Sequence, residues 1–258
     1  QLLKRSDLQT LAESRDLDEL VTRIKNTKYL DAINSVAKPY TAEKLEIALR
    51  AKLADEQFKI AKSSGNSKIL DAFFQRFIIS NLKLILKGKI LGKSQEEISA
   101  FFNMHAEELA KQRDIVVKAL VAKDLEEAVS SLGSSPFSDE IQKAVELYNE
   151  TKNIQAFDVY FDKMLYQNIT RALRSENDQD ISHIYGMETD FYNVMSIVRG
   201  KFWGLDDERI EDLTVGASVN IPNQVMDRMM AAENVKDALD ELSTTRYKDL
   251  VPETEDEV

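Results

Sequence analysis

The stretch Asn81-Leu-Lys-Leu-Ile-Leu-Lys-Gly-Lys-Ile-Leu-Gly-Lys-Ser-Gln-Glu-Glu-Ile98 recurs further along the chain, without a gap, as Asn193-Val-Met-Ser-Ile-Val-Arg-Gly-Lys-Phe-Trp-Gly-Leu-Asp-Asp-Glu-Arg-Ile210. The two stretches share the first Asn, both glycines, the Lys between the glycines and the final Ile. Each is typical of a long amphipathic helix that ends at a glycine and is followed by a second, capped helix. This repeated pair of helices decides the fold.

A second pattern occurs three times along the chain. Each copy predicts a short helix and closes on a Ser/Thr-x-aromatic sequence, where the hydroxyl can cap and the ring can pack. The copies begin at Asp16, Asp124 and Asn234, and they close at Thr27, Ser135 and Thr245. This spacing nearly equals the spacing of the first pattern. Two independent patterns with nearly the same period predict a repeat protein with about 110 residues per unit.

The repeat predicts three units. Residues 1–123 form the first, which is trimmed at its N-terminus, and 124–233 form the second. Residues 234–258 begin a third unit that is incomplete and carries an acidic tail. Helical spacing of apolar residues runs through all three, and we expect an all-α protein of about ten helices. Capping residues are expected at Thr41, Ser94, Ser138 and Asp206, and helix-ending glycines at Gly65, Gly92 and Gly204.

Composition narrows the range of functions. The 258 residues carry a net charge of −11, which disfavours nucleic-acid binding because phosphate backbones are repelled. There is no cysteine, and the two histidines, His105 and His183, are far apart, so we expect no disulfide, no metal site and no cofactor. No apolar run is long enough to span a bilayer, which predicts a soluble protein or subunit.

The stretch from Thr189 to Ile210 resembles the signature of the C subunit of archaeal and bacterial A/V-type ATP synthases, which is homologous to the d subunit of the vacuolar ATPase. Residues 77–92 resemble the same signature in the preceding repeat, and Leu20 to Tyr29 resembles the N-terminal segment of that family. The resemblance implies a funnel of three helical units around a pseudo-threefold axis, with the third unit largely absent here.

The resemblance further implies a non-catalytic central-stalk subunit. It would receive the stalk subunits, sit on the membrane rotor ring and transmit torque between proton or sodium translocation and ATP synthesis or hydrolysis. It would lie peripherally on the cytoplasmic side of the membrane and bind no nucleotide, nucleic acid or small-molecule substrate. The alternatives are a generic helical-repeat scaffold with other partners and, third, an enzyme that uses carboxylates.

Seven positions in the repeated stretches are candidates for structural or interface roles. We expect the two asparagines to hydrogen bond to a neighbouring helix, with direct contact to a partner as the alternative. We expect the lysines of the run from Lys83 to Lys93 to extend to solvent from a packed helix, with lipid headgroups or an acidic partner as the alternative. The seven are Asn81, Lys87, Lys89, Asn193, Arg199, Lys201 and Trp203, and Lys83 and Lys93 belong to the same cationic run.

The only tryptophan and the two histidines each admit two interpretations. Trp203 corresponds to Ile90 and Leu91 in the other repeat, so we expect a core position, with an interface anchor as the alternative. His105 could act as a general base beside Glu108, but no second catalytic partner recurs nearby, and we expect a partly exposed helix residue. The same interpretation applies to His183.

Overall fold

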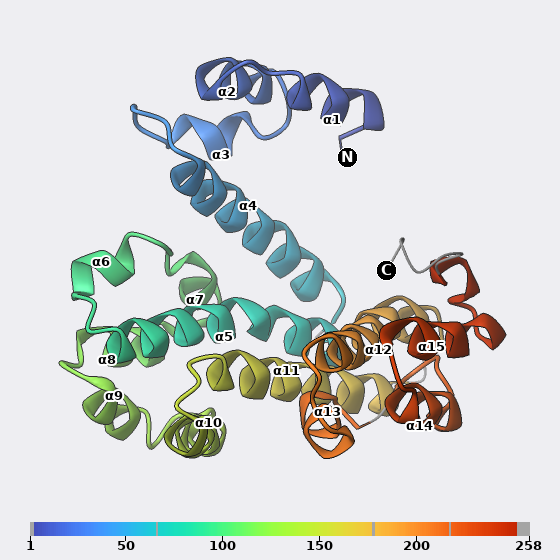
Figure 1. Ribbon diagram of the computed structural model, residues 1–258. Coiled ribbons are helices and arrows are strands. Elements are labelled where there is room, and N and C mark those ends of the chain that lie inside the picture. Colours follow the sequence, from blue (N-terminus) through green and yellow to red (C-terminus); the bar gives the residue numbers. More distant parts are fainter. Residues whose placement is uncertain (1–2, 66, 177–178, 217, 252–258) are drawn as a thin grey trace. The chain divides into compact units, whose positions relative to one another are not determined.

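A computed structural model describes residues 3–65, 67–176, 179–216 and 218–251 (Figure 1). These residues form fifteen α-helices and two short 3-10 helices, with no β-strand among them, which confirms the all-α prediction. The expected number of about ten helices was too low. Part of the reason is that Lys111 and Lys152 adopt left-handed backbone conformations and end helices without a glycine. None of the helices in the described ranges is long and apolar enough to cross a membrane.

The chain divides into two compact units. The first comprises 1–66 and 77–135, and the second comprises 67–76 and 136–258. Helix α5 (Lys68–Ile90) therefore contributes residues to both. This division follows the packing of the chain, whereas the predicted boundaries after residues 123 and 233 follow the sequence repeat and stay a prediction.

The N-terminal part of the first unit has its own small core. Helices α2 and α3 pack on each other, and α3 packs on the long helix α4 (Figure 1). Val21, Ile24, Ile33 and Leu45 are buried between them. Thr41 caps α4 as predicted, because its hydroxyl accepts the Lys44 N–H at 3.3 Å. The helices are α1 (Arg5–Ala12), α2 (Leu17–Lys25), α3 (Leu30–Asn34) and α4 (Ala42–Ser63).

The rest of the first unit is built on the second half of α5. Its buried face is continuous because apolar residues recur every three or four positions, as in Ile78, Leu82 and Ile85. Ser94 and Glu97 form the predicted capping box at the start of α6. The following helices are α6 (Gln95–Ser99), α7 (His105–Ala110), α8 (Arg113–Val121) and α9 (Leu125–Ser131).

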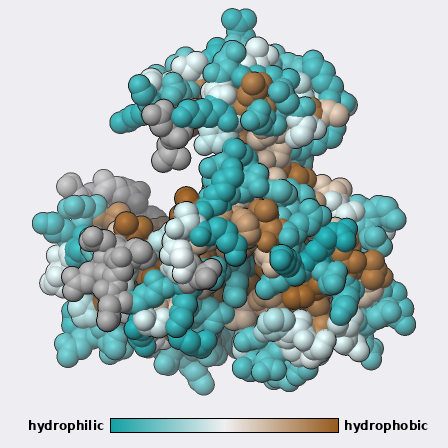
Figure 2. Space-filling model, turned by 180° about the vertical axis from the view of Figure 1, so that it is seen from behind, coloured by the Kyte–Doolittle hydropathy of each residue, from teal (hydrophilic) through white to brown (hydrophobic). Residues whose placement is uncertain are grey.

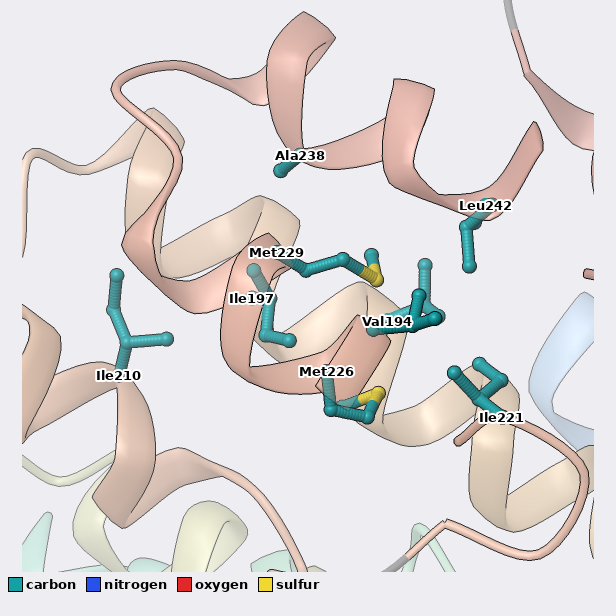
Figure 3. Packing of buried hydrophobic residues seen from close by; sticks show 9 residues of the cluster. Val194, Ile197, Ile210, Ile221, Met226, Met229, Ala238 and Leu242 are labelled. Atoms are coloured by element: carbon teal, nitrogen blue, oxygen red, sulfur yellow. The ribbon is translucent and has the colours of Figure 1, made fainter. Parts of the chain in front are cut away.

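In the second unit, α11 packs on α10 and α12, and α13, α14 and α15 gather beside α12 (Figure 1). Figure 3 shows the core at this point, where Val194 and Ile197 of α12 face Met226 and Met229 of α14. Asp206 caps α13 as predicted, but Ser138 does not cap α10 and is its first residue. The helices are α10 (Ser138–Thr151), α11 (Ala156–Ser175), α12 (Gln179–Phe202), α13 (Asp207–Leu213), α14 (Asn223–Ala231), α15 (Val235–Asp240), η1 (Glu241–Thr244) and η2 (Lys248–Leu250).

The pattern that occurs three times in the sequence has the same local structure each time. The side chains of Asp16, Asp124 and Asn234 each accept the backbone N–H three residues later, at 2.8–2.9 Å. At each closing residue, the backbone N–H donates to the carbonyl three residues earlier, at 2.9 Å in all three copies. The sequence repeat is therefore also a repeat of local structure.

In the third copy, the aromatic residue also bonds to a buried carboxylate. Asp190 of α12 is fully buried and accepts hydrogen bonds from the Tyr247 hydroxyl at 2.7 Å, from the Val219 N–H at 2.7 Å and from the Asn220 N–H at 2.9 Å. The segment 219–220 reaches this carboxylate because Gly186 leaves room for it, as a Cβ there would lie 2.5 Å from Val219. These bonds fix the C-terminal segment on α12.

The first glycine of each repeated stretch lies against the final isoleucine. A Cβ on Gly200 would lie 2.5 Å from Cγ1 of Ile210, and a Cβ on Gly88 would lie 2.7 Å from the same atom of Ile98. Both isoleucines are buried. Only glycine therefore lets the next helix pack this close, which explains why both stretches carry it.

We expect Gly200→Ala to lower the free energy of unfolding by about 1–3 kcal/mol, because the added methyl group overpacks the contact with Ile210. In an Ile210→Ala background the same change should be neutral or stabilising, since alanine favours a helix over glycine by up to about 1 kcal/mol. Urea unfolding of the four proteins of this cycle measures the coupling. An equal cost in both backgrounds would contradict the packing explanation.

Candidate functional site: two equivalent helix ends

Helix α12 ends in a hydrogen-bonded turn around Gly204. The Gly204 N–H donates to the Lys201 carbonyl at 3.0 Å, and the Leu205 N–H donates to the Gly200 carbonyl at 2.9 Å. Gly204 has a φ of 68°, a left-handed conformation that glycine adopts without steric cost. This pair of bonds is the Schellman motif, which satisfies carbonyls that a helix end otherwise leaves free.

Helix α5, which carries the first copy of the repeated stretch, ends in the same way. The Gly92 N–H donates to the Lys89 carbonyl at 3.1 Å, and the Lys93 N–H donates to the Gly88 carbonyl at 2.9 Å. Gly92 has a φ of 65°. The predicted helix-ending glycines at 92 and 204 are therefore confirmed, as is Gly65 with a φ of 71°.

The lysine between the two glycines reaches the C-terminus of a later helix. The Lys89 ammonium donates to the carbonyls of Leu120, at 2.8 Å, and Ala122, at the end of α8. The Lys201 ammonium donates to the carbonyl of Met230, at the end of α14. A cation at this position satisfies free carbonyls and complements the helix dipole. The expected extension to solvent is thus wrong for Lys89.

The two asparagines bond to equivalent segments of their units. Asn81 donates its amide to the Asn103 carbonyl at 3.1 Å, and Asn193 accepts the Val215 N–H at 2.8 Å. Positions 103 and 215 have the same spacing in the sequence as the two asparagines. Asn193 also donates to the Ser218 hydroxyl at 3.2 Å. In the structure, each asparagine thus joins the long helix to the segment that follows the next short helix.

Asn81 also contacts a buried acid that sequence reasoning missed. It donates to Oε1 of Glu107 at 2.6 Å, and the Glu107 side chain is fully buried. Oε2 of Glu107 has no hydrogen-bond partner within the described residues. Burial is the main cause that raises the pKa of the Glu107 carboxyl above its ordinary value. In the sequence Ala106-Glu-Glu108, no sequence signal distinguishes the buried Glu107 from its exposed neighbour Glu108.

The remaining cations and histidines occupy varied positions. Arg199 is exposed, Lys87 is half-buried, and Lys93 pairs with Glu97 at 2.8 Å. His105 contacts Asp55 of α4 at 2.7 Å between Nε2 and Oδ1, and the Glu108 carboxylate pairs with Arg113 at 3.3 Å. His183 contacts Arg246. The described part of the chain holds no group of three or more acidic or histidine side chains placed to bind a metal ion.

The aromatic residues at the end of α12 are exposed. Phe202 has 79% of its surface exposed and Trp203 has 54%, and Leu91, the counterpart of Trp203, has 63%. The expected core position of Trp203 is therefore wrong. The buried face of α12 runs through Val194 and Ile197, and helical periodicity turns the next apolar pair away from it. Figure 2 shows one face of the molecule, on which hydrophobic patches lie among hydrophilic residues.

Comparison with known proteins gives a family match and individual relatives that agree with each other. The whole chain, residues 1–258, matches the family described as ATP synthase (C/AC39) subunit. It is 27% identical over 262 residues to the C subunit of the A-type ATP synthase of Methanocaldococcus jannaschii, with 97% of this chain and 63% of the relative covered. The protein of the same name from Thermococcus kodakarensis is 25% identical over 264 residues, with 99% and 67% covered. The chain thus spans about two thirds of the length of these relatives.

We expect Lys201→Met to lower the free energy of unfolding by about 1–3 kcal/mol, because it removes a charged donor and leaves a helix-end carbonyl unsatisfied. The Lys201 side chain is only 7% exposed. Lys93→Met is the matched control, since this lysine forms an exposed ion pair that contributes about 0–1 kcal/mol. Urea unfolding measures both, and equal losses would show that the Lys201 contact contributes no special stability.

We expect Glu107→Gln to change the pH dependence of stability. Because the folded-state pKa is raised, the wild type loses stability as pH rises from the ordinary Glu value of 4.5 through the folded-state pKa. Glutamine does not titrate, so the stability of the variant relative to the wild type should increase across that window. Urea unfolding at a series of pH values tests this, and parallel curves for the two proteins would rule it out.

Proposed function

The chain belongs to the ATP synthase (C/AC39) subunit family, and we propose that it forms part of the subunit that couples the central stalk of an A/V-type rotary ATP synthase to the membrane rotor ring. Members of this family are accessory, non-catalytic subunits of the complex. The coupling would transmit torque between proton or sodium translocation and ATP synthesis or hydrolysis. The observation that carries the proposal is the family match over residues 1–258.

The internal construction of the chain supports a mechanical role. A part that transmits torque must resist deformation, and the repeated helix ends are tied to other elements by side-chain bonds. Lys201 bonds to the end of α14, and Asn193 bonds to the backbone at Val215. In the first unit, Lys89 and Asn81 make the corresponding bonds. Hydrogen bonds that recur in this way between helices and their neighbouring segments favour stiffness within each unit.

We further propose that the repeated units of the whole subunit surround a pseudo-threefold axis and form a funnel-like socket. The same cap at Asp16, Asp124 and Asn234 supports this, because it provides three structurally similar starting points. The generic helical-repeat scaffold would instead form an open superhelix. The family match favours the socket.

The partners of this subunit would be the central-stalk subunits on one side and the rotor ring subunits on the other. We propose that it is a peripheral subunit on the cytoplasmic side of the membrane and that it binds no nucleotide, nucleic acid or small-molecule substrate. The formal net charge of −11 fits an electrostatic contribution to the choice of protein partners.

We expect the purified chain to bind the stalk subunits or the detergent-solubilised rotor ring of the same organism in a pull-down, and to show no ATPase activity alone. An unrelated acidic helical protein of similar size serves as the control for non-specific capture. Failure to bind both the stalk and the ring would overturn the coupling role, and ATP hydrolysis by the isolated chain would overturn the non-catalytic assignment.

A further inference from the structure

The end of α12 carries two neighbouring aromatic side chains in solvent. Phe202 and Trp203 precede Gly204, the turn glycine, and both are more than half exposed. Large aromatic residues are costly to leave in water and are enriched at the centres of protein interfaces. Exposure of two in a row at a helix end therefore needs an explanation that packing within the described chain does not supply.

The pair is held on a rigid base. The Trp203 N–H donates to the Arg199 carbonyl at 2.9 Å, and the two bonds of the Gly204 turn follow directly. Lys201, next to Phe202, is tied to Met230 and lies 3.3 Å from Asp207. The backbone beneath both rings is therefore fixed before any partner binds, which lowers the entropic cost of association.

Helix α13, next to the pair, exposes mainly acidic residues, and Arg199 of α12 is an exposed cation one turn before Trp203. Helix α13 begins three residues after Gly204 and packs on the end of α12. Its exposed residues include Asp207, Glu208, Glu211 and Asp212, against a single cation, Arg209. An anionic membrane surface would be repelled by these carboxylates. A protein surface with Lys or Arg side chains around an apolar recess complements them.

We propose that Phe202 and Trp203 are the anchor by which this chain binds another subunit of the complex, through an apolar recess edged by basic residues, with the carboxylates of α13 contacting that basic edge. The inference rests on the proposed function and names the chemistry of the partner surface. The rings fill the recess and provide most of the affinity. The carboxylates of α13 orient the two proteins as they associate and make the association depend on salt concentration.

The test measures dissociation constants of the full chain for the purified stalk subunits and, separately, for the detergent-solubilised rotor ring. We expect Trp203→Ala to raise the constant for one of them by about 30-fold, the effect of losing an anchor of about 2 kcal/mol. Trp203→Phe should retain much of the affinity. Leu250→Ala is the control for loss of an exposed apolar side chain elsewhere in the unit, since Leu250 is 58% exposed.

The charge contribution has its own matched pair of variants. Glu208→Lys with Glu211→Lys reverses two exposed carboxylates of α13, and Glu146→Lys with Glu150→Lys makes the same charge change on exposed positions of α10. We expect only the α13 variant to weaken binding several-fold and to reduce its dependence on salt. Circular dichroism confirms that each variant is folded.

The single tryptophan supplies a direct readout. Acrylamide should quench Trp203 fluorescence in the free chain, and binding should protect it and shift its emission to shorter wavelengths, relative to the spectrum of the partner alone. Wild-type binding that Trp203→Ala leaves unchanged would overturn this inference and leave the coupling role intact. Protection by vesicles of phosphatidylcholine and phosphatidylglycerol, without protection by either subunit preparation, would overturn it in favour of a lipid contact. Failure of the wild type to bind either preparation would overturn the coupling role, and this inference with it.

Discussion

The packing of each unit depends on one close approach, that of a glycine in a long helix to an isoleucine in the next short helix. In the second unit, Ile210 occupies the space that a Cβ on Gly200 would need. Because α13 packs this close, its buried residue joins the core formed with α14 and α15 (Figure 3). The first unit makes the same contact between Gly88 and Ile98. One missing methyl group thus sets the position of the helix that follows.

The residues near this contact show what the sequence could and could not predict. The helix-ending glycines and the caps at Asp206 and Ser94 were predictable, because they depend on bonds within a few residues. The partner of Lys201 was not, because Met230 is 29 residues away and their contact depends on how α14 packs. The ends of α7 and α10 were missed for a different reason, since Lys111 and Lys152 adopt conformations that the sequence signals assign to glycine.

The exposure of Trp203 shows a limit of comparing repeats. Ile90 and Leu91 suggested a core position because apolar residues recur at equivalent sites, but Leu91 is exposed as well. Equivalence between repeats preserves the local geometry, including the direction in which a side chain points. It does not reveal whether that direction leads to the core. Helical periodicity from Ile197 carries that information, and it places the aromatic pair off the buried face.

The turn at Gly204 links the inside of the second unit to its surface. On one side of the chain, Lys201 and Gly200 connect this turn to α14 and α13. On the other side, Phe202 and Trp203 extend into solvent from the same short segment of helix. A force applied to the rings would pass into the core through a charged hydrogen bond and a tight packing contact, with no flexible loop between. A helix end built this way would suit the coupling role proposed above, because the proposed binding surface and the contacts that hold the fold share one backbone segment.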